Sequence, residues 1–215
     1  MNPLIAQVST RIYGWDLAVF RHIHSATPPS SAMLHLARAL AEGPLLITAG
    51  LLGLMMVRPG WGMRGKALKV SAAAVAALVL NAGIGLVWDR ARPFVTGAGH
   101  AWMSHAATGS FPSDHLTVQW VVAGTLMLDR RSRRWGVLIA LMGLPMAWAR
   151  VYLGIHYPSD MLGAVIVALL LTLFVDAWFP RHAQADLSGH GAERQAKPTN
   201  APRQESSDTV SARTH

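Results

Sequence analysis

The sequence predicts an all-α protein, a polytopic membrane helical bundle with about five transmembrane helices and an amphipathic helix at its N-terminus. Two observations lead to this fold class. Hydrophobic residues make up 52% of the 215-residue chain and charged residues only 14%, which is more apolar than a typical soluble domain. In addition, the chain contains five apolar runs, four of them near or above the roughly 20 residues that a helix needs to cross about 30 Å of hydrocarbon.

The first 25 residues are expected to form the amphipathic helix. Their apolar character is broken by Arg11, Asp16, Arg21, His22 and His24, so the uninterrupted apolar core of a cleavable signal sequence is missing. We predict a helix that lies on the membrane surface and does not span it.

The five apolar runs are the predicted spans. They cover residues 31–57, 67–88, 114–128, 135–153 and 158–179. The third run is shorter than a full crossing requires. Its N-terminal end should therefore lie below the membrane surface or be buried among the other helices.

We assign residues 1–180 to one membrane-embedded domain. After Pro180 the sequence has almost no large apolar residues, and residues 181–215 are expected to form a disordered hydrophilic tail in the cytoplasm. The chain contains no cysteine, which excludes disulfides and thiolate metal sites.

Basic residues predict the orientation of the bundle. They are Arg58, Arg64, Lys66 and Lys69 around one connection and Arg130, Arg131, Arg133 and Arg134 around another. Because Lys and Arg accumulate on the cytoplasmic side, both connections should lie inside, and the segments 89–113 and 150–158 should face outward. This topology accounts for most of the net charge of +8, so no nucleic-acid partner is expected.

Three polar clusters should then meet at the outward end. They are Arg90 with Arg92, then Ser113 with Asp114 and His115, and finally Arg150 with His156 and Asp160. Ionisable residues near membrane depth are by default functional. Guanidiniums, a serine hydroxyl and helix N-terminal amides suit a phosphoryl group, and two histidines can supply a nucleophile and a general acid.

The histidines differ in their expected roles. His156 and Asp160 are four residues apart, which places them on one face if the helix continues through Pro158. A neighbouring carboxylate fixes the tautomer of a histidine and stabilises its charged form. His156 is therefore the expected nucleophile, and His115 at a helix start is the expected general acid.

These segments resemble the signature of the type 2 phosphatidic acid phosphatase superfamily of membrane lipid phosphatases, usually written K-x6-RP, PSGH and SR-x5-H-x3-D. The chain reads RP from Arg92, PSDH over 112–115 and ARVYLGIHYPSD over 149–160. The resemblance implies that His156 forms a phosphohistidine, that Asp160 orients it and that His115 protonates the departing oxygen.

The same resemblance implies that Arg92, Ser113 and Arg150 hold the phosphate oxygens, and that no metal or other cofactor is needed. The chain departs from the signature at Gly85 in place of lysine, Asp114 in place of glycine and Ala149 in place of serine. We count Asp114 with the phosphate-binding residues, and we expect Arg90 to replace the missing lysine.

The sequences NAGIGLVWDRARPFVTG and HAATGSFPSDH resemble one subgroup more closely, the bacterial undecaprenyl-diphosphate phosphatases linked to bacitracin resistance. This resemblance implies a multi-pass protein of the bacterial inner (plasma) membrane whose active site faces the periplasm or cell exterior. There it would remove the terminal phosphate of undecaprenyl diphosphate and so recycle the carrier lipid for peptidoglycan and surface-polysaccharide synthesis. The expected partners are this lipid diphosphate and the membrane lipids.

The sequence leaves two alternatives open. One is a phosphatase for another lipid phosphate, namely phosphatidylglycerol phosphate, phosphatidic acid or the phosphate of lipid A. The other is a non-hydrolytic lipid-phosphate carrier that uses the same arginines. His100 and His105 match no position of the signature. One interpretation makes them contacts of the lipid headgroup, and the one we favour makes them solvated loop residues.

Overall fold

The computed structural model describes residues 3–178, and within them all regular structure is helical. The helices are α1 (Pro3–Ile23), α2 (Ser31–Val57), the short 3₁₀ helix η1 (Pro59–Trp61), α3 (Arg64–Val87), α4 (Asp114–Met127), α5 (Arg133–Tyr152) and α6 (Pro158–Trp178). The predicted all-α class is confirmed. The predicted cytoplasmic tail, 181–215, lies outside the described residues.

Four of the five predicted spans are long and apolar enough to cross a membrane. They are α2, α3, α5 and α6. All four carry large apolar side chains that stay exposed in the bundle, such as Leu46 on α2, Val79 on α3 and Phe174 on α6, which are 70%, 67% and 58% exposed. Such rows of exposed apolar groups are suited to lipid as their solvent.

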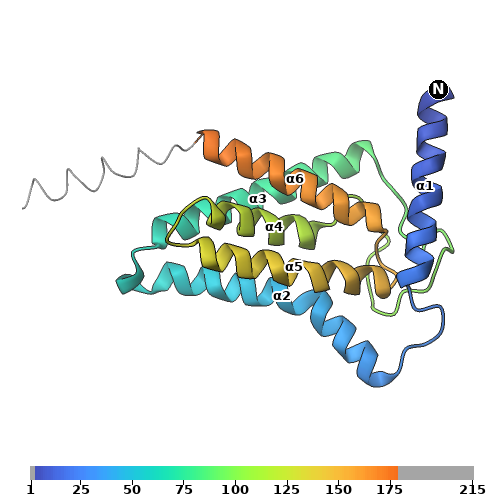
Figure 1. The fold of residues 1–215 in the computed structure, drawn as a ribbon, viewed down its shortest axis with the longest axis horizontal. Coiled ribbons are helices and arrows are strands. Elements are labelled where there is room, and N and C mark those ends of the chain that lie inside the picture. The colour runs from blue at the N-terminus through green and yellow to red at the C-terminus, as the bar shows by residue number, and fades with distance from the viewer. Residues whose placement is uncertain (1–2, 179–215) are drawn as a thin grey trace, which may run out of the picture. The chain divides into compact units, whose positions relative to one another are not determined.

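The fifth predicted span, α4, is short and lies inside the bundle. Its 14 residues extend about 21 Å at 1.5 Å per residue, less than the roughly 30 Å of a bilayer core. It packs against α3, α5 and α6 (Figure 1). Leu116, Val121, Val122 and Leu126 on this helix are fully buried. The sequence predicted such burial for the N-terminal end, and the structure extends it along the helix.

Glycines bring the helices around α4 into close contact. A Cβ atom at Gly136 of α5 would lie 2.6 Å from the carbonyl oxygen of Ala123 on α4. One at Gly143 would lie 2.5 Å from the indole nitrogen of Trp120. Small residues at such contacts let membrane helices approach closely and pack by van der Waals contact.

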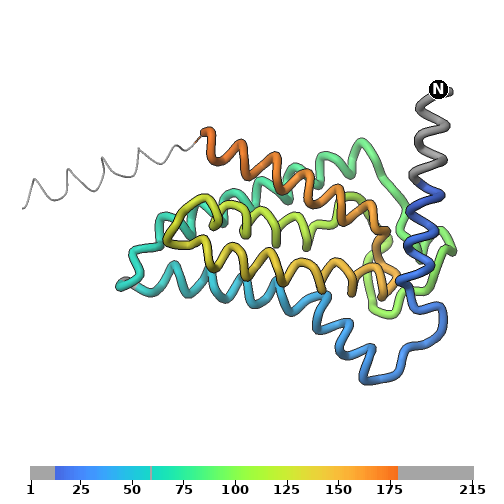
Figure 2. The backbone as a smooth tube through the Cα atoms, in the orientation of Figure 1, coloured from blue at the N-terminus to red at the C-terminus, as the bar shows by residue number. Residues whose placement is uncertain are grey.

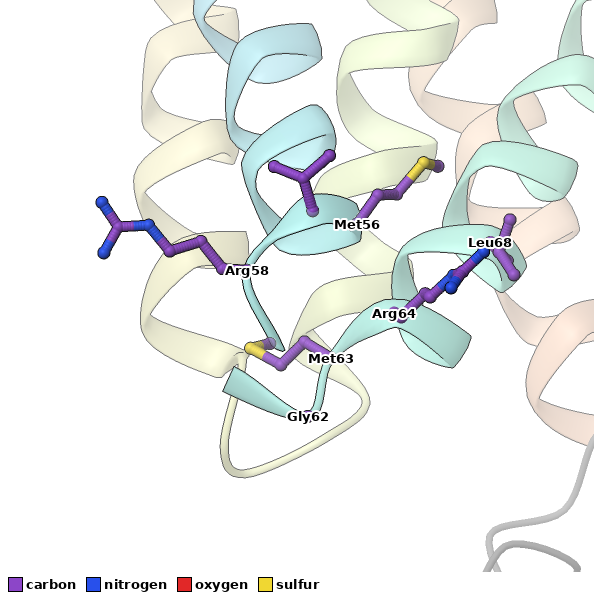
Figure 3. Close-up of a pocket in the computed structure, with 7 residues that line it drawn as sticks. Met56, Arg58, Gly62, Met63, Arg64 and Leu68 are labelled. Carbon is purple, nitrogen blue, oxygen red and sulfur yellow. The ribbon is translucent and has the colours of Figure 1, made fainter. Parts of the chain in front are cut away.

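One end of the bundle carries the two basic connections, and we call it the basic end. Lys66 at the start of α3 forms an ion pair with Asp129 and donates to Ser132 Oγ at 3.2 Å, which joins the connection after α2 to the connection after α4. A hollow of about 660 Å³ lies here (Figure 3), lined by Met56, Val57, Arg58, Gly62, Met63, Arg64 and Leu68. None of these residues belongs to the three polar clusters.

The other end, which we call the loop end, holds the long connection 88–113, the turn 153–157 and the C-terminal half of α1. Figure 2 shows the connection after α3 running beside α1 before the chain enters α4. Trp102 fixes its middle, because its backbone N–H donates to Leu153 O at 2.9 Å and its indole donates to Ser25 O at 2.8 Å. Arg38 on α2 donates to the Trp102 carbonyl at 2.7 Å.

Candidate active site

The three polar clusters meet at the loop end. Arg92 Nη1 donates to the Ile155 carbonyl at 3.0 Å and lies 3.1 Å from His156 Nε2. The backbone N–H of Ser113 donates to the Asp160 carbonyl at 3.3 Å. The connection before α4 and the start of α4 thus form one site with the end of α5 and the start of α6, although most of α4 and α5 separates the two regions in sequence.

The turn between α5 and α6 sets the positions of His156 and Asp160. Gly154 has φ +78°, and a Cβ atom there would lie 2.1 Å from the His100 carbonyl oxygen, so only glycine fits without strain. Pro158 is the first residue of α6, where a missing N–H costs no hydrogen bond. His156 therefore precedes the helix and Asp160 lies in its first turn.

The contacts of His156 fix its tautomer. Nδ1 lies 3.2 Å from Asp160 Oδ2, which also accepts the backbone N–H of Tyr157 at 2.8 Å. On the other side of the ring, Arg92 can only donate, so Nε2 is the acceptor. The imidazole therefore carries its proton on Nδ1, toward the carboxylate, and its lone pair on Nε2, which is the arrangement that a nucleophilic histidine needs.

The surroundings keep His156 uncharged. Its side chain is 2% exposed, and this burial, followed by the positive charges of Arg150 and Arg92, holds its pKa well below the usual 6.5. A neutral imidazole at neutral pH is the reactive form, because protonation would remove the lone pair on Nε2.

Arg150 and Ser113 present buried polar atoms without protein partners. Arg150 is 1% exposed and donates from Nη1 to the Ala41 carbonyl at 3.2 Å. Among the described residues, Arg150 Nε and Ser113 Oγ are two of five buried side-chain nitrogen and oxygen atoms that make no hydrogen bond. Because an unsatisfied buried donor costs about 1–3 kcal/mol, two such groups in one site suit a ligand with several acceptor oxygens.

Arg90 has different partners from those expected of a residue that binds phosphate. Its Nη1 donates to Asp160 Oδ1 at 2.8 Å, its Nη2 is paired with Asp16, and its guanidinium lies 4.2 Å from the centre of the Tyr157 ring. Two carboxylates therefore engage this guanidinium. The contacts give Arg90 a role in holding Asp160, and a contact with phosphate remains a prediction.

Asp16 on α1 is a residue of this network that sequence reasoning missed. It is fully buried and accepts from the backbone N–H and the hydroxyl of Ser159 at 2.9 and 2.6 Å. Phe20, one turn later, is also fully buried and lies 5.5 Å from the Tyr157 ring. The only signal in the sequence was a single carboxylate within the apolar and aromatic stretch YGWDLAVF.

The first two residues of α4 differ in their surroundings. Asp114 is exposed, and Oδ1 accepts from Asn81 Nδ2 on α3 at 2.9 Å. Asn81 also donates to Thr117 Oγ1 at 3.0 Å, so this amide joins α3 to the start of α4. His115 is half-buried.

His105 is half-buried and lies in the site, which differs from the solvated loop residue that we favoured and leaves its interpretation as a headgroup contact open. Its ring centre is 6.0 Å from that of His156 with the planes nearly perpendicular, and its Nε2 lies 3.3 Å from Arg150 Nη2. Burial, followed by the charge of Arg92, lowers the pKa of His105. His100, in contrast, is exposed.

Taken together, these groups provide a histidine lone pair, guanidinium and hydroxyl donors and a second half-buried histidine. That set matches nucleophilic attack on a phosphoryl group followed by protonation of the leaving oxygen. In the part of the chain that the structure describes, no three histidine or carboxylate side chains gather as metal ligands would.

The chain is similar to known membrane phosphatases in sequence. A model described as the PAP2 superfamily matches residues 66–184. The chain is 34% identical over 160 residues to "Putative undecaprenyl-diphosphatase YbjG" of Escherichia coli (strain K12), covering 72% of this chain and 78% of that protein. It is 30% identical over 153 residues to undecaprenyl-diphosphatase BcrC of Bacillus subtilis (strain 168), covering 71% and 78%.

A solved structure shares the fold. The transmembrane PAP2 type phosphatidylglycerolphosphate phosphatase from Bacillus subtilis superposes with a TM-score of 0.61, covering 78% of this chain and 86% of that one. At 18% sequence identity, this likeness concerns the arrangement of helices and not the substrate.

Proposed function

The chain belongs to the PAP2 superfamily as a membrane lipid phosphatase, and we propose that its substrate is undecaprenyl diphosphate. In this proposal the enzyme releases inorganic phosphate and undecaprenyl phosphate, which returns to peptidoglycan synthesis, and its activity confers bacitracin resistance. The observation that carries the chemistry is the His156 imidazole, whose Nδ1 faces Asp160 and whose Nε2 lone pair faces Arg92.

The first step forms a phosphohistidine. Nε2 of His156 attacks the terminal phosphorus, and the bond from this phosphorus to the bridging oxygen breaks. Arg92 Nη1 moves from Nε2 to a phosphoryl oxygen, where Arg150 and Ser113 also donate. His115 gives its proton to the departing oxygen of undecaprenyl phosphate, and Asp160 stabilises the Nδ1–H of the charged intermediate.

The second step uses water. His115, now neutral, takes a proton from a water molecule that attacks the same phosphorus. The P–N bond breaks, inorganic phosphate leaves, and His156 returns to the neutral form with its lone pair on Nε2. The net reaction consumes one water for each anhydride bond cleaved.

Two observations support this substrate and its location. The relatives at 30–34% identity are named as undecaprenyl-diphosphatases. The site lies at the loop end of the bundle. The basic end lies opposite, and the accumulation of Lys and Arg there favours the cytoplasmic side for the basic end. We therefore place the protein in the bacterial inner membrane with its site facing the periplasm or cell exterior, where a lipid tail stays in the bilayer while its diphosphate enters the site.

The decisive experiment measures phosphate release by the detergent-solubilised protein, with chelator present. Undecaprenyl diphosphate is compared with phosphatidylglycerol phosphate, phosphatidic acid and lipid A, and His156→Ala is compared with the surface control His35→Ala. We expect release to favour the isoprenoid diphosphate and to disappear only in His156→Ala. Faster release from another lipid would identify that lipid as the substrate instead. Binding of lipid without release of phosphate would favour the carrier alternative.

A further inference from the structure

We propose that His105 is a further substrate-binding residue: its imidazole contacts the phosphoryl group that His156 attacks, from the side of Arg150. The inference rests on the proposed hydrolysis of a lipid phosphate and adds a residue to it. It also bears on the missing lysine of the signature. Gly85 stands at that position and has no side chain to bind a phosphate.

The loop holds His105 in place from both sides. Three residues before it, Trp102 is fixed by Leu153, Ser25 and Arg38. Three residues after it, Thr108 O accepts from Arg92 Nε at 2.9 Å, and the next carbonyl, of Gly109, accepts from Arg92 Nη2 at 2.9 Å. The short segment between these two anchors cannot carry the imidazole far from the site.

The contact between His105 and Arg150 shows which tautomer is present. Arginine only donates, so Nε2 of His105 accepts from Arg150 Nη2. Nδ1 then carries the proton and donates to the Ala106 carbonyl at 3.2 Å. In this state Nε2 offers Arg150 the kind of acceptor that a phosphate oxygen would offer.

The charges around His105 predict what a phosphate changes. The groups that face it are Arg92 and Arg150, the two histidines His115 and His156, and the carboxylate of Asp114. With two guanidiniums as the nearest charges, the neutral imidazole is favoured. A phosphate dianion bound among the same groups favours the imidazolium, because opposite charges then surround it. His105 should therefore take up a proton when phosphate binds and donate from Nε2 to a phosphoryl oxygen.

The test titrates inorganic phosphate into the detergent-solubilised protein between pH 5.5 and 8, beside steady-state kinetics on undecaprenyl diphosphate. His105→Asn is compared with wild type, with His105→Lys and with the matched control His100→Asn in the same loop. We expect His105→Asn to weaken phosphate binding and raise KM by about 10- to 100-fold, as for a charge-assisted hydrogen bond, with a smaller change in kcat.

The pH dependence separates substrate contact from a structural role. As pH falls, the phosphate affinity of wild type should rise relative to that of His105→Asn, and the slopes of log affinity against pH should differ by about one proton. The ionisation of phosphate itself cancels in this comparison. His105→Lys, whose charge does not titrate in this range, should recover affinity but keep the slope of His105→Asn.

Several outcomes would overturn the proposal. If His105→Asn matches His100→Asn in affinity and KM, His105 does not touch the substrate. If affinity falls but the slope stays that of wild type, the residue only supports the loop. Melting temperatures monitor folding, and His105→Gln replaces the asparagine variant if the latter unfolds. The phosphate titration needs no lipid, so it remains decisive even if undecaprenyl diphosphate proves not to be the substrate.

Discussion

The low pKa of His156 makes a prediction about the acid side of the pH–rate profile. Burial first, and then Arg150 and Arg92, depress the pKa of the folded enzyme, so the nucleophile stays neutral at neutral and mildly acidic pH. The acid limb of kcat/KM should accordingly lie well below pH 6.5. Replacing Arg92 with Gln removes a positive charge next to Nε2 and should move that limb to higher pH.

The Arg92→Gln variant should also lose about 10- to 100-fold in kcat/KM, the range for one charged hydrogen bond. The pH dependence of kcat/KM is measured for wild type and Arg92→Gln on undecaprenyl diphosphate between pH 4 and 8. The pH at which the acid limb begins is compared separately from the loss in rate. An unchanged limb in Arg92→Gln would mean that the guanidinium does not act on His156.

Asp160 leads to a second prediction for a single residue. Asparagine at this position keeps the size of the side chain but cannot hold the Nδ1–H of His156 as a carboxylate does. In serine proteases the equivalent change costs about 10⁴-fold in kcat, and we expect a loss of about 10³-fold or more for Asp160→Asn. Single-turnover assays of phosphate release measure it, and a loss below about tenfold would contradict the assigned role.

For single residues, the sequence predicted the site residues that lie close together in the chain. It missed the residues that reach the site only through the folding of distant segments. His156 and Asp160 are close in sequence, so their contact was predictable even though Pro158 begins a new helix between them. His105 and Asp16 could not be assigned in this way. The position of His105 depends on the anchoring of Trp102, and that of Asp16 depends on how α1 docks.

Among the elements, α1 has the role least expected from its sequence. Its amphipathic pattern predicted a helix that lies on the membrane surface, with its apolar face toward lipid, and gave no sign that its C-terminal half packs against the bundle. In the structure Asp16 and Phe20 of this helix are fully buried at the loop end. The carboxylate of Asp16 connects the helix to Arg90 and Ser159, and through Arg90 to Asp160.

Removing the Asp16 carboxylate should therefore loosen both α1 and the site. Loss of one partner of a buried ion pair costs about 3–5 kcal/mol. We expect Asp16→Ala to lower the melting temperature and kcat, with a smaller change in KM, because Arg90 no longer holds Asp160 in place. Arg21→Ala, an exposed change on the same helix, is the control. If the two variants have the same melting temperature and kcat, α1 does not help to position the catalytic residues.

The turn 153–157 makes a prediction of its own. Alanine at Gly154 would need a left-handed backbone and would bring its Cβ atom to 2.1 Å from a backbone oxygen. We expect Gly154→Ala to cost at least about 1–3 kcal/mol and to reduce activity by displacing His156. Gly53→Ala in α2, where a Cβ atom meets nothing within 4 Å, should leave both the melting temperature and the activity close to wild type.

For the whole molecule, composition and run length were sufficient to predict a helical membrane bundle, because in lipid the backbone must satisfy its own hydrogen bonds. The burial of the N-terminal end of α4 was predictable from its length, since a run this short cannot reach across the bilayer core. Which helices contact one another was not predictable, because close approach depends on matched surfaces such as Gly136 against Ala123.

Orientation is the last prediction, and the absence of cysteine from the sequence makes it directly measurable. The distribution of Lys and Arg places the basic end inside, so the loop end should be open to the cell exterior or periplasm. His100→Cys reports on the loop end and Arg131→Cys on the basic end, since both positions are exposed. A membrane-impermeant maleimide applied to intact spheroplasts should label the first variant and not the second, and both should react after the membrane is permeabilised. The reverse pattern would put the site in the cytoplasm, where it could not act on the diphosphate exposed at the outer face of the membrane.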